Sequence, residues 1–194
     1  MLGKSHTALG SYLAERYMPH LSAAHYKAFL LGCIQPDRNP ATYLKGSVRH
    51  QWLRGHNYGN ARRFMQRISK RLESRNQLNI YDYYTLGKLI HYTADSFTYA
   101  HNAAFAKPLS LHRAYESELQ SHFLRYIASD PSVEICHQQT IMDGIIHCHR
   151  RYFQGSPSVH RDCRFALQAC CCVLSFLFLP TPLNSRGIPE VHLK

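Results

Sequence analysis

The sequence predicts an all-α protein that folds as a single domain. Its 194 residues are enough for one hydrophobic core, and a content of 45% hydrophobic and 18% charged residues is ordinary for a globular protein. Apolar residues recur at helical spacing in several segments, and no segment has the alternation that predicts a strand. We therefore expect a multi-helix bundle over residues 1–179, followed by an irregular tail over residues 180–194.

The first quarter of the chain predicts two helices and a long loop. Ser5 can cap a first helix that runs to about Tyr17, and a second apolar segment covers residues 19–31. Residues 32–40 contain a glycine and two prolines, which predict a loop, and this loop continues to about Trp52. A connection of that length in a compact domain is usually either functional or disordered.

The rest of the chain predicts five further helices, over residues 57–75, 79–97, 110–129, 133–153 and 159–179. The first of them has a basic face, which we interpret as exposed to solvent. The residues of this face are Arg62, Arg63, Arg67, Lys70 and Arg71.

Charge and cysteine content narrow the class of protein further. A net charge of +11 attracts anions such as phosphates, nucleic acid and acidic lipid headgroups. Seven cysteines with no CxxC pair favour reduced thiols over a framework of disulfides. The N-terminus lacks the apolar core of a signal peptide, and the apolar run over residues 169–179 is too short for a membrane span. We expect a cytoplasmic protein.

Two pairs of potential metal ligands share one spacing. His91 and Asp95 are four residues apart, as are His112 and Glu116, and His101 lies between the pairs. Residues four apart lie on one face of a helix, so each pair can offer a nitrogen and an oxygen to one ion. With 14 histidines in the chain, some such pairs also arise by chance as surface pairs. The spacing alone leaves a metal site and surface pairs as alternatives.

Three more residues are candidates of the same kind: His6 at the first helix, Asp37 after a proline, and His50 near the end of the long loop. Each alone is better explained as an ordinary polar residue. In chain order, however, the eight candidates and the segment LGKLIHYTADSFTYAHN resemble the zinc-dependent phospholipase C family and the related single-strand-specific zinc nucleases. The resemblance spans roughly residues 3–120.

The resemblance implies an all-α domain that binds two or three zinc ions in a cleft between helices and loops. One ion would be held by His50, His91 and Asp95, with Asp37 beside it as a further ligand or base. A second would be held by His101, His112 and Glu116. A third would be held by His6, by Asp95 as a bridge, and by the amino and carbonyl groups of Met1. Secreted relatives have a tryptophan in place of Met1.

The resemblance further implies a phosphoric ester hydrolase, namely a phosphodiesterase of the phospholipase C type. Such an enzyme would use a zinc-bound hydroxide. Asp37 would be the catalytic residue that orients or deprotonates the water. Its substrate would be an anionic phosphate ester, either a phospholipid or a soluble analogue. Two alternatives remain: a nuclease or nucleotidase on the same cluster, and a non-catalytic helical module that binds metal. Contact with nucleic acid, peripheral contact with a membrane surface and the oligomeric state are left open.

Other residues near the candidates are assigned less closely. The aromatic residues Trp52, Phe97, Tyr99 and Phe105 either line the substrate cleft or pack in the core. Four histidines have no spacing that connects them with the candidate ligands, and we leave them out of the predicted site: His56, His122, His147 and His149.

Overall fold

The computed structural model describes residues 1–39, 41, 56–102, 109–136 and 138–179, with residues 109–113 described by their backbone alone. These residues form seven α-helices and one short 3-10 helix, and none of them lies in a strand. The all-α prediction is confirmed. The helices are α1 (Gly3–Tyr17), α2 (Ala23–Arg38), α3 (Tyr58–Glu73), α4 (Ile80–Ser96), η2 (Tyr99–His101), α5 (Leu109–Ala128), α6 (Ile141–Tyr152) and α7 (Val159–Phe178).

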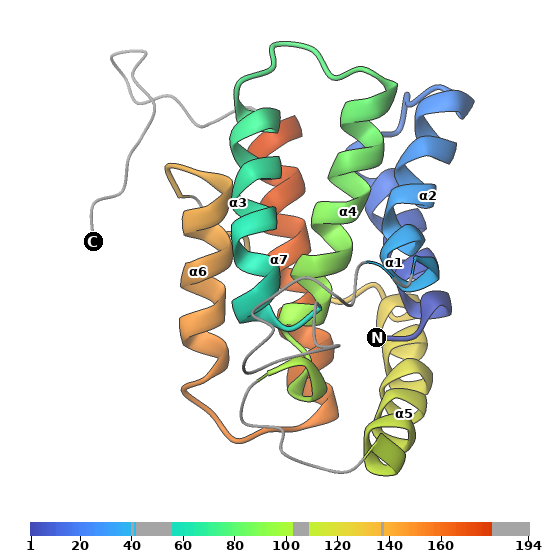
Figure 1. Ribbon diagram of the computed structural model, residues 1–194, viewed down its shortest axis with the longest axis vertical. Coiled ribbons are helices and arrows are strands. Elements are labelled where there is room, and N and C mark those ends of the chain that lie inside the picture. Colours follow the sequence, from blue (N-terminus) through green and yellow to red (C-terminus); the bar gives the residue numbers. More distant parts are fainter. Residues whose placement is uncertain (40, 42–55, 103–108, 137, 180–194) are drawn as a thin grey trace.

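Helix α4 is the centre of the bundle. It packs against α1, α2, α3 and α7, and in Figure 1 α3, α4, α6 and α7 run side by side along the long axis. Every residue from 89 to 98 is buried, including both His91 and Asp95. Polar side chains at the buried end of a central helix need partners, because burial without them is costly. The buried end of α4 is therefore the place in the fold where partners for His91 and Asp95 are expected.

Two glycines bring α2 and α4 into close contact. A Cβ atom added to Gly87 would fall on the carbonyl oxygen of Phe29, and one added to Gly32 would fall on the carbonyl oxygen of Tyr84. The backbones of the two helices can approach this closely only because neither position has a side chain. This contact holds the end of α2, which carries Asp37, beside α4.

The prediction of a loop from residue 32 onward is wrong, because α2 continues to Arg38. Gly32 serves helix packing here rather than ending the helix. Pro36 lies in the last turn and is buried, and the helix lacks the bond that an N–H at this position would donate to the carbonyl of Gly32. Asp37 consequently lies on a helix rather than in a turn. The remainder of the predicted loop, including His50 and Trp52, lies outside the described residues.

The predicted helix starts are accurate at α4 and wrong at α1 and α6. Asn79 caps α4, and its side chain and that of Asp82 bond reciprocally to each other's backbone N–H. Ser5 caps nothing: α1 begins at Gly3 and Ser5 is buried inside it. Helix α6 begins at Ile141, eight residues after the predicted start at residue 133. Its cap is Thr140, whose side chain accepts a hydrogen bond from the N–H of Asp143.

Other expectations about the surface and the tail have mixed outcomes. On α3 the predicted basic face is exposed except for Arg71, which is half-buried and pairs with Asp82 at 2.8 Å. Residues 180–194 lie outside the described residues, so their irregularity and the domain boundary at 179 stay predictions. Within the described helices, no segment is long and apolar enough to cross a membrane.

Candidate metal centre

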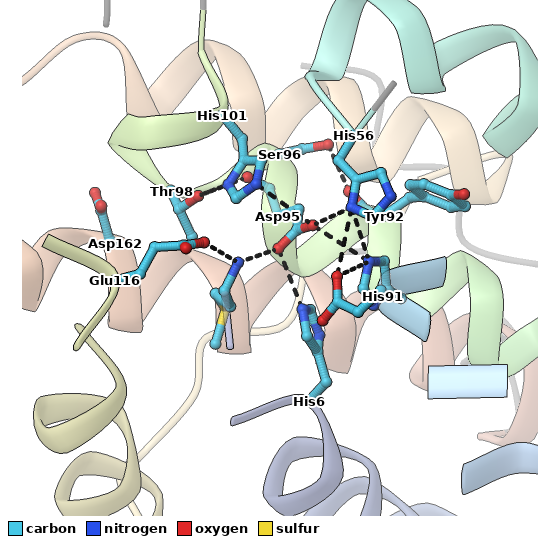
Figure 2. Close-up of polar contacts among 12 residues, drawn as sticks. His6, His56, His91, Tyr92, Asp95, Ser96, Thr98, His101, Glu116 and Asp162 are labelled. Atoms are coloured by element: carbon cyan, nitrogen blue, oxygen red, sulfur yellow. Dashed lines mark hydrogen bonds and ion pairs between the residues drawn. The ribbon is translucent and has the colours of Figure 1, made fainter. Parts of the chain in front are cut away.

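Asp95, in the last turn of α4, is the residue on which the other side chains of the site converge (Figure 2). Its Oδ1 lies 2.6 Å from the amino group of Met1 and 3.2 Å from His6 Nε2. Its Oδ2 lies 3.3 Å from His91 Nε2 and 3.4 Å from His56 Nδ1. The N-terminal segment, the residue before α3 and α4 itself thus all contact one fully buried carboxylate.

The charge of Asp95 is maintained by these neighbours. Burial raises the pKa of an acid, but the neighbouring His101 ring, the Met1 ammonium group and the His91 ring outweigh it and hold the pKa of Asp95 well below its usual range. The Met1 amino group is affected in the opposite sense: burial lowers its pKa, yet Asp95 and Glu116 raise it to about 10. The ammonium group lies 3.3 Å from Glu116, so a cation already lies between two carboxylates.

The hydrogen bond of His91 determines which of its nitrogens carries the proton. Nδ1 lies 2.9 Å from the carbonyl oxygen of Cys33 in α2. Because a carbonyl can only accept, Nδ1 donates, and in the neutral ring Nε2 carries a lone pair. That lone pair faces the carboxylates of Asp95, at 3.3 Å, and Asp37, at 3.6 Å. Lone pairs that face each other in a buried site repel unless a proton or a metal ion lies between them.

His101 is oriented in the same way by Thr98. The Thr98 hydroxyl donates to the carbonyl oxygen of Asp95 at 2.9 Å, so toward His101 Nδ1, at 2.8 Å, it accepts. His101 Nδ1 therefore donates, and Nε2 directs its lone pair toward Asp95 Oδ2 at 3.9 Å. A metal-binding histidine is held in this manner by a hydrogen bond at its other nitrogen.

His6 is buried on α1 and stacks on His91, with ring centroids 3.9 Å apart. Neither of its ring nitrogens has a hydrogen-bond partner, and neither has Asp95 Oδ2. Burial, with the nearby charge of His91, lowers the pKa of His6 to about 3. Burial, with the charge of the Met1 amino group, lowers the pKa of His101 to about 3. Both rings are neutral at ordinary pH, which is the form that binds metals.

Asp37 lies at the more open side of the cluster. Its Oδ1 is 3.6 Å from His91 Nε2 and 3.6 Å from His56 Nδ1. Its side chain is 23% exposed, whereas that of Asp95 is 0% and that of Glu116 is 14% exposed. Burial raises the pKa of Asp37, against the opposing charge of His91. Among these three carboxylates, Asp37 is the one most accessible to a water molecule.

The donor atoms fall into two groups, in each of which all atoms lie within 4.8 Å of one another, and Asp95 belongs to both. The first group is His6, Asp37, His91 and Asp95. The second group is His56, Asp95 and His101. Imidazole and carboxylate donors suit zinc, and a shared carboxylate suits two ions close together. Zinc ions bound at these two groups would separate the facing lone pairs and would give the buried donor atoms a partner.

Most of the residues singled out in the sequence meet here. His6, Asp37, His91, Asp95, His101, Glu116 and Met1 lie at one site. His50 and the side chain of His112 lie outside the described residues. The grouping by distance keeps Asp37 with His91, as the resemblance implies, but places His6 with them rather than at a third ion. Which ion each residue holds stays a prediction.

His56 is the residue that sequence reasoning missed. It is 2% exposed and its Nδ1 lies 3.4 Å from both His91 Nε2 and Asp95 Oδ2. A topological signal was present in the chain. The short connection between α3 and α4 makes these helices antiparallel neighbours, so a residue just before α3 lies beside the end of α4, where Asp95 is.

Asp162 supports the site from α7 without contacting the donors named above. It is fully buried, accepts from the N–H of Tyr99 at 2.9 Å and from the hydroxyl of Tyr152 at 2.6 Å. Burial raises its pKa to about 7. Tyr99 begins η2, the short helix that carries His101, so Asp162 positions that histidine. Phe97, one of the aromatic residues considered for the cleft, is instead a core residue stacked on Phe165.

Comparison with known proteins agrees with this geometry. Residues 5–163 match the family model described as zinc dependent phospholipase C. Comparisons with curated proteins and with solved structures gave no match. The matched region begins inside α1 and extends to the start of α7, and it includes every donor residue of the two groups. The chain belongs to the zinc-dependent phospholipase C family, a family of enzymes whose activity is the hydrolysis of phospholipid phosphodiesters with zinc.

Proposed function

We propose that this chain hydrolyses the phosphodiester bond between the glycerol and the phosphorylated headgroup of a phospholipid, and that its zinc ions bind at Asp95. The observation that carries the proposal is the arrangement of His91. Its Nδ1 donates to Cys33, so its Nε2 lone pair faces two carboxylates within 3.6 Å. A divalent cation is the partner that suits such an arrangement.

Two ions are supported by the donor groups. One would be held by His6, Asp37, His91 and Asp95, and the other by His56, Asp95 and His101. A third would take the position of the ammonium proton between Asp95 and Glu116, which requires a neutral Met1 amino group. Zinc bound here would supply positive charge to the phosphate and lower the pKa of a coordinated water.

Asp37 is the proposed general base. With one of its oxygens on the ion, the other carboxylate oxygen would take the proton of the attacking water, because Asp37 is the most exposed of the three carboxylates. Asp95 stays ionised in this scheme and orients the surrounding histidines. His6 and His101 stay neutral and add no charge that would oppose the cations.

The charge of the site suits an anionic ester. Asp37, Asp95 and Glu116 contribute three negative charges at most, which two divalent cations exceed. The net charge of +11 of the whole chain adds a favourable long-range field for anionic substrates or an anionic lipid surface. The cytoplasmic localisation expected from the sequence remains part of the proposal.

A substrate panel tests the proposal. Phosphatidylcholine vesicles, single-stranded DNA and a phosphomonoester would each be incubated with the enzyme, with added zinc and with a chelator. We expect phosphocholine release that depends on zinc. Digestion of DNA without release of phosphocholine would favour the nuclease alternative, and no hydrolysis of any substrate by the zinc-loaded protein would contradict an enzymatic role.

A further inference from the structure

Three cysteines from three separate segments meet in a second cluster. Cys136 lies between α5 and α6, Cys148 lies on α6, and Cys172 lies on α7. The Sγ of Cys136 is 3.4 Å from that of Cys148 and 2.9 Å from that of Cys172. All three sulfur atoms lie within 4.8 Å of one another, and none belongs to the histidine site.

Ordinary packing does not explain this arrangement. Carbon atoms in a core pack best at about 3.5–4.0 Å, and the larger sulfur atoms here are closer than that. The backbone N–H of Cys136 also donates to Cys172 Sγ at 3.2 Å, which favours a negatively charged sulfur. The three thiols thus lie close enough together for one cation to replace their protons.

We propose that Cys136, Cys148 and Cys172 form a thiolate site for one zinc ion, separate from the histidine site. Binding would release one proton from each thiol and form three sulfur–zinc bonds. Two sulfurs bound to one tetrahedral zinc ion at about 2.3 Å lie about 3.8 Å apart. The separations of 3.4 and 2.9 Å are shorter than this, so the sulfurs would move apart on binding, and an outward shift of Cys136 lengthens both separations.

The position of the site points to a structural role. Cys148 is fully buried and Cys172 nearly so, whereas Cys136 is half-buried and gives the ion a route from solvent. The segment before α6 is also held by the bond from Gln168 Nε2 to the Glu134 carbonyl at 2.9 Å and by the ion pair of Glu134 with Arg151 at 3.3 Å. A metal ion would fasten this segment to α6 and α7. Water, or the exposed His147 next to Cys148, would complete the coordination.

Cobalt titration of the full, reduced chain tests the proposal. Cobalt bound by thiolates has a strong charge-transfer absorption in the near ultraviolet, whereas cobalt bound only by nitrogen and oxygen lacks it. We expect this band to saturate at one ion per chain and to be competed away by zinc. The donors of the histidine site are nitrogen and oxygen, so binding there leaves the band unchanged.

Matched variants assign the band to its ligands. Cys136→Ala and Cys148→Ala are expected to lose it, while Cys163→Ala, which truncates a buried cysteine of α7 outside the cluster, is expected to retain it. Circular dichroism verifies that each variant is folded, and Cys136 is half-buried and so the mildest substitution. Absence of the band in the reduced parent protein overturns the proposal. So does a Cys136–Cys172 disulfide, found by mass spectrometry, that excludes metal.

Discussion

His56 and Asp95 are the two side chains on which the arrangement of the metal centre depends most directly. Asp95 offers one oxygen to Met1 and His6 and the other to His91 and His56. His56 in turn contacts both carboxylates, at 3.4 Å from Asp95 and 3.6 Å from Asp37. A residue in such a position contributes a donor and also sets the spacing of the others.

Substituting His56 by alanine is therefore expected to weaken zinc binding and hydrolysis together. We expect a loss of about 10- to 100-fold in each, which is the range for disturbed metal sites. The measurement is zinc affinity by competition with a chromophoric chelator, alongside phosphocholine release.

The matched control is His122→Ala, because His122 lies on α5 and contacts His160 rather than the cluster. Its zinc affinity and activity are expected to equal those of the parent protein. Equal zinc affinity in the parent protein and His56→Ala would remove His56 from the site.

The pH dependence of stability gives a second test at the scale of single residues. The pKa of buried Asp162 is about 7 in the folded protein, compared with 3.8 as the ordinary value. The folded chain thus binds this proton more tightly than the unfolded chain. The stabilising contribution is complete below the ordinary pKa and is lost as the pH rises through about 7.

Asp162→Asn removes this titration and can keep partners for Tyr99 and Tyr152. Between about pH 5 and pH 8, we expect the free energy of unfolding of the parent protein to fall relative to the variant by roughly 1–3 kcal/mol. Urea denaturation of both proteins at each pH measures this difference. A constant difference across that range would show that Asp162 does not titrate there.

At the scale of helices, the close contact between α2 and α4 positions the donors of both. Gly87→Ala would place a methyl group on the carbonyl oxygen of Phe29 and 2.8 Å from the backbone nitrogen of Cys33, the residue whose carbonyl holds His91. Overpacking against backbone cannot be relieved by a side-chain rotation. We expect a cost of about 2–3 kcal/mol in unfolding free energy and a reduced zinc affinity.

Gly144→Ala is the matched control for this substitution. Gly144 lies inside α6, and a Cβ there meets nothing within 4 Å. Alanine is favoured over glycine in a helix, so we expect a gain of up to about 1 kcal/mol. Thermal unfolding of both variants decides the matter, and a Gly87→Ala protein as stable as Gly144→Ala would contradict the close contact.

The helices also show what could be predicted from sequence. The start of α4 was predictable because Asn79 and Asp82 form a local capping arrangement, and the spacing of His91 and Asp95 follows from helix geometry. The extent of α2 was not, because glycine and proline usually end helices, and the contact with α4 that explains Gly32 is made between residues far apart in the chain. Local signals predict elements, whereas tertiary packing determines these exceptions.

The same distinction applies to the site. The donors on α4 and Glu116 could be found from spacing, and His6, Asp37 and His101 from their order in the chain. His56 could not be found from spacing or order, because no fixed spacing links it to the other donors. Only the antiparallel packing of α3 and α4, expected from their short connection, places it beside Asp95. Spacing in the sequence therefore identifies donors that are close in the chain, but not donors that come together only in the folded protein.

At the scale of the whole molecule, the metal centre links the ends of several elements. His6 comes from α1, Asp37 from α2, His91 and Asp95 from α4, and His101 from η2. Ions that bind only the folded chain stabilise it by mass action. The same ions that act on the phosphate would therefore also stabilise the packing of these elements.

The most direct test compares zinc content with phosphocholine release from phosphatidylcholine in the parent protein and in Asp95→Asn. We expect the parent protein to carry at least two zinc ions in the histidine site, to lose activity on chelation and to regain it with zinc. Asp95→Asn should stay helical and lose at least about 100-fold in activity. Full activity in the zinc-free parent protein, or undiminished zinc content and activity in Asp95→Asn, would contradict the account.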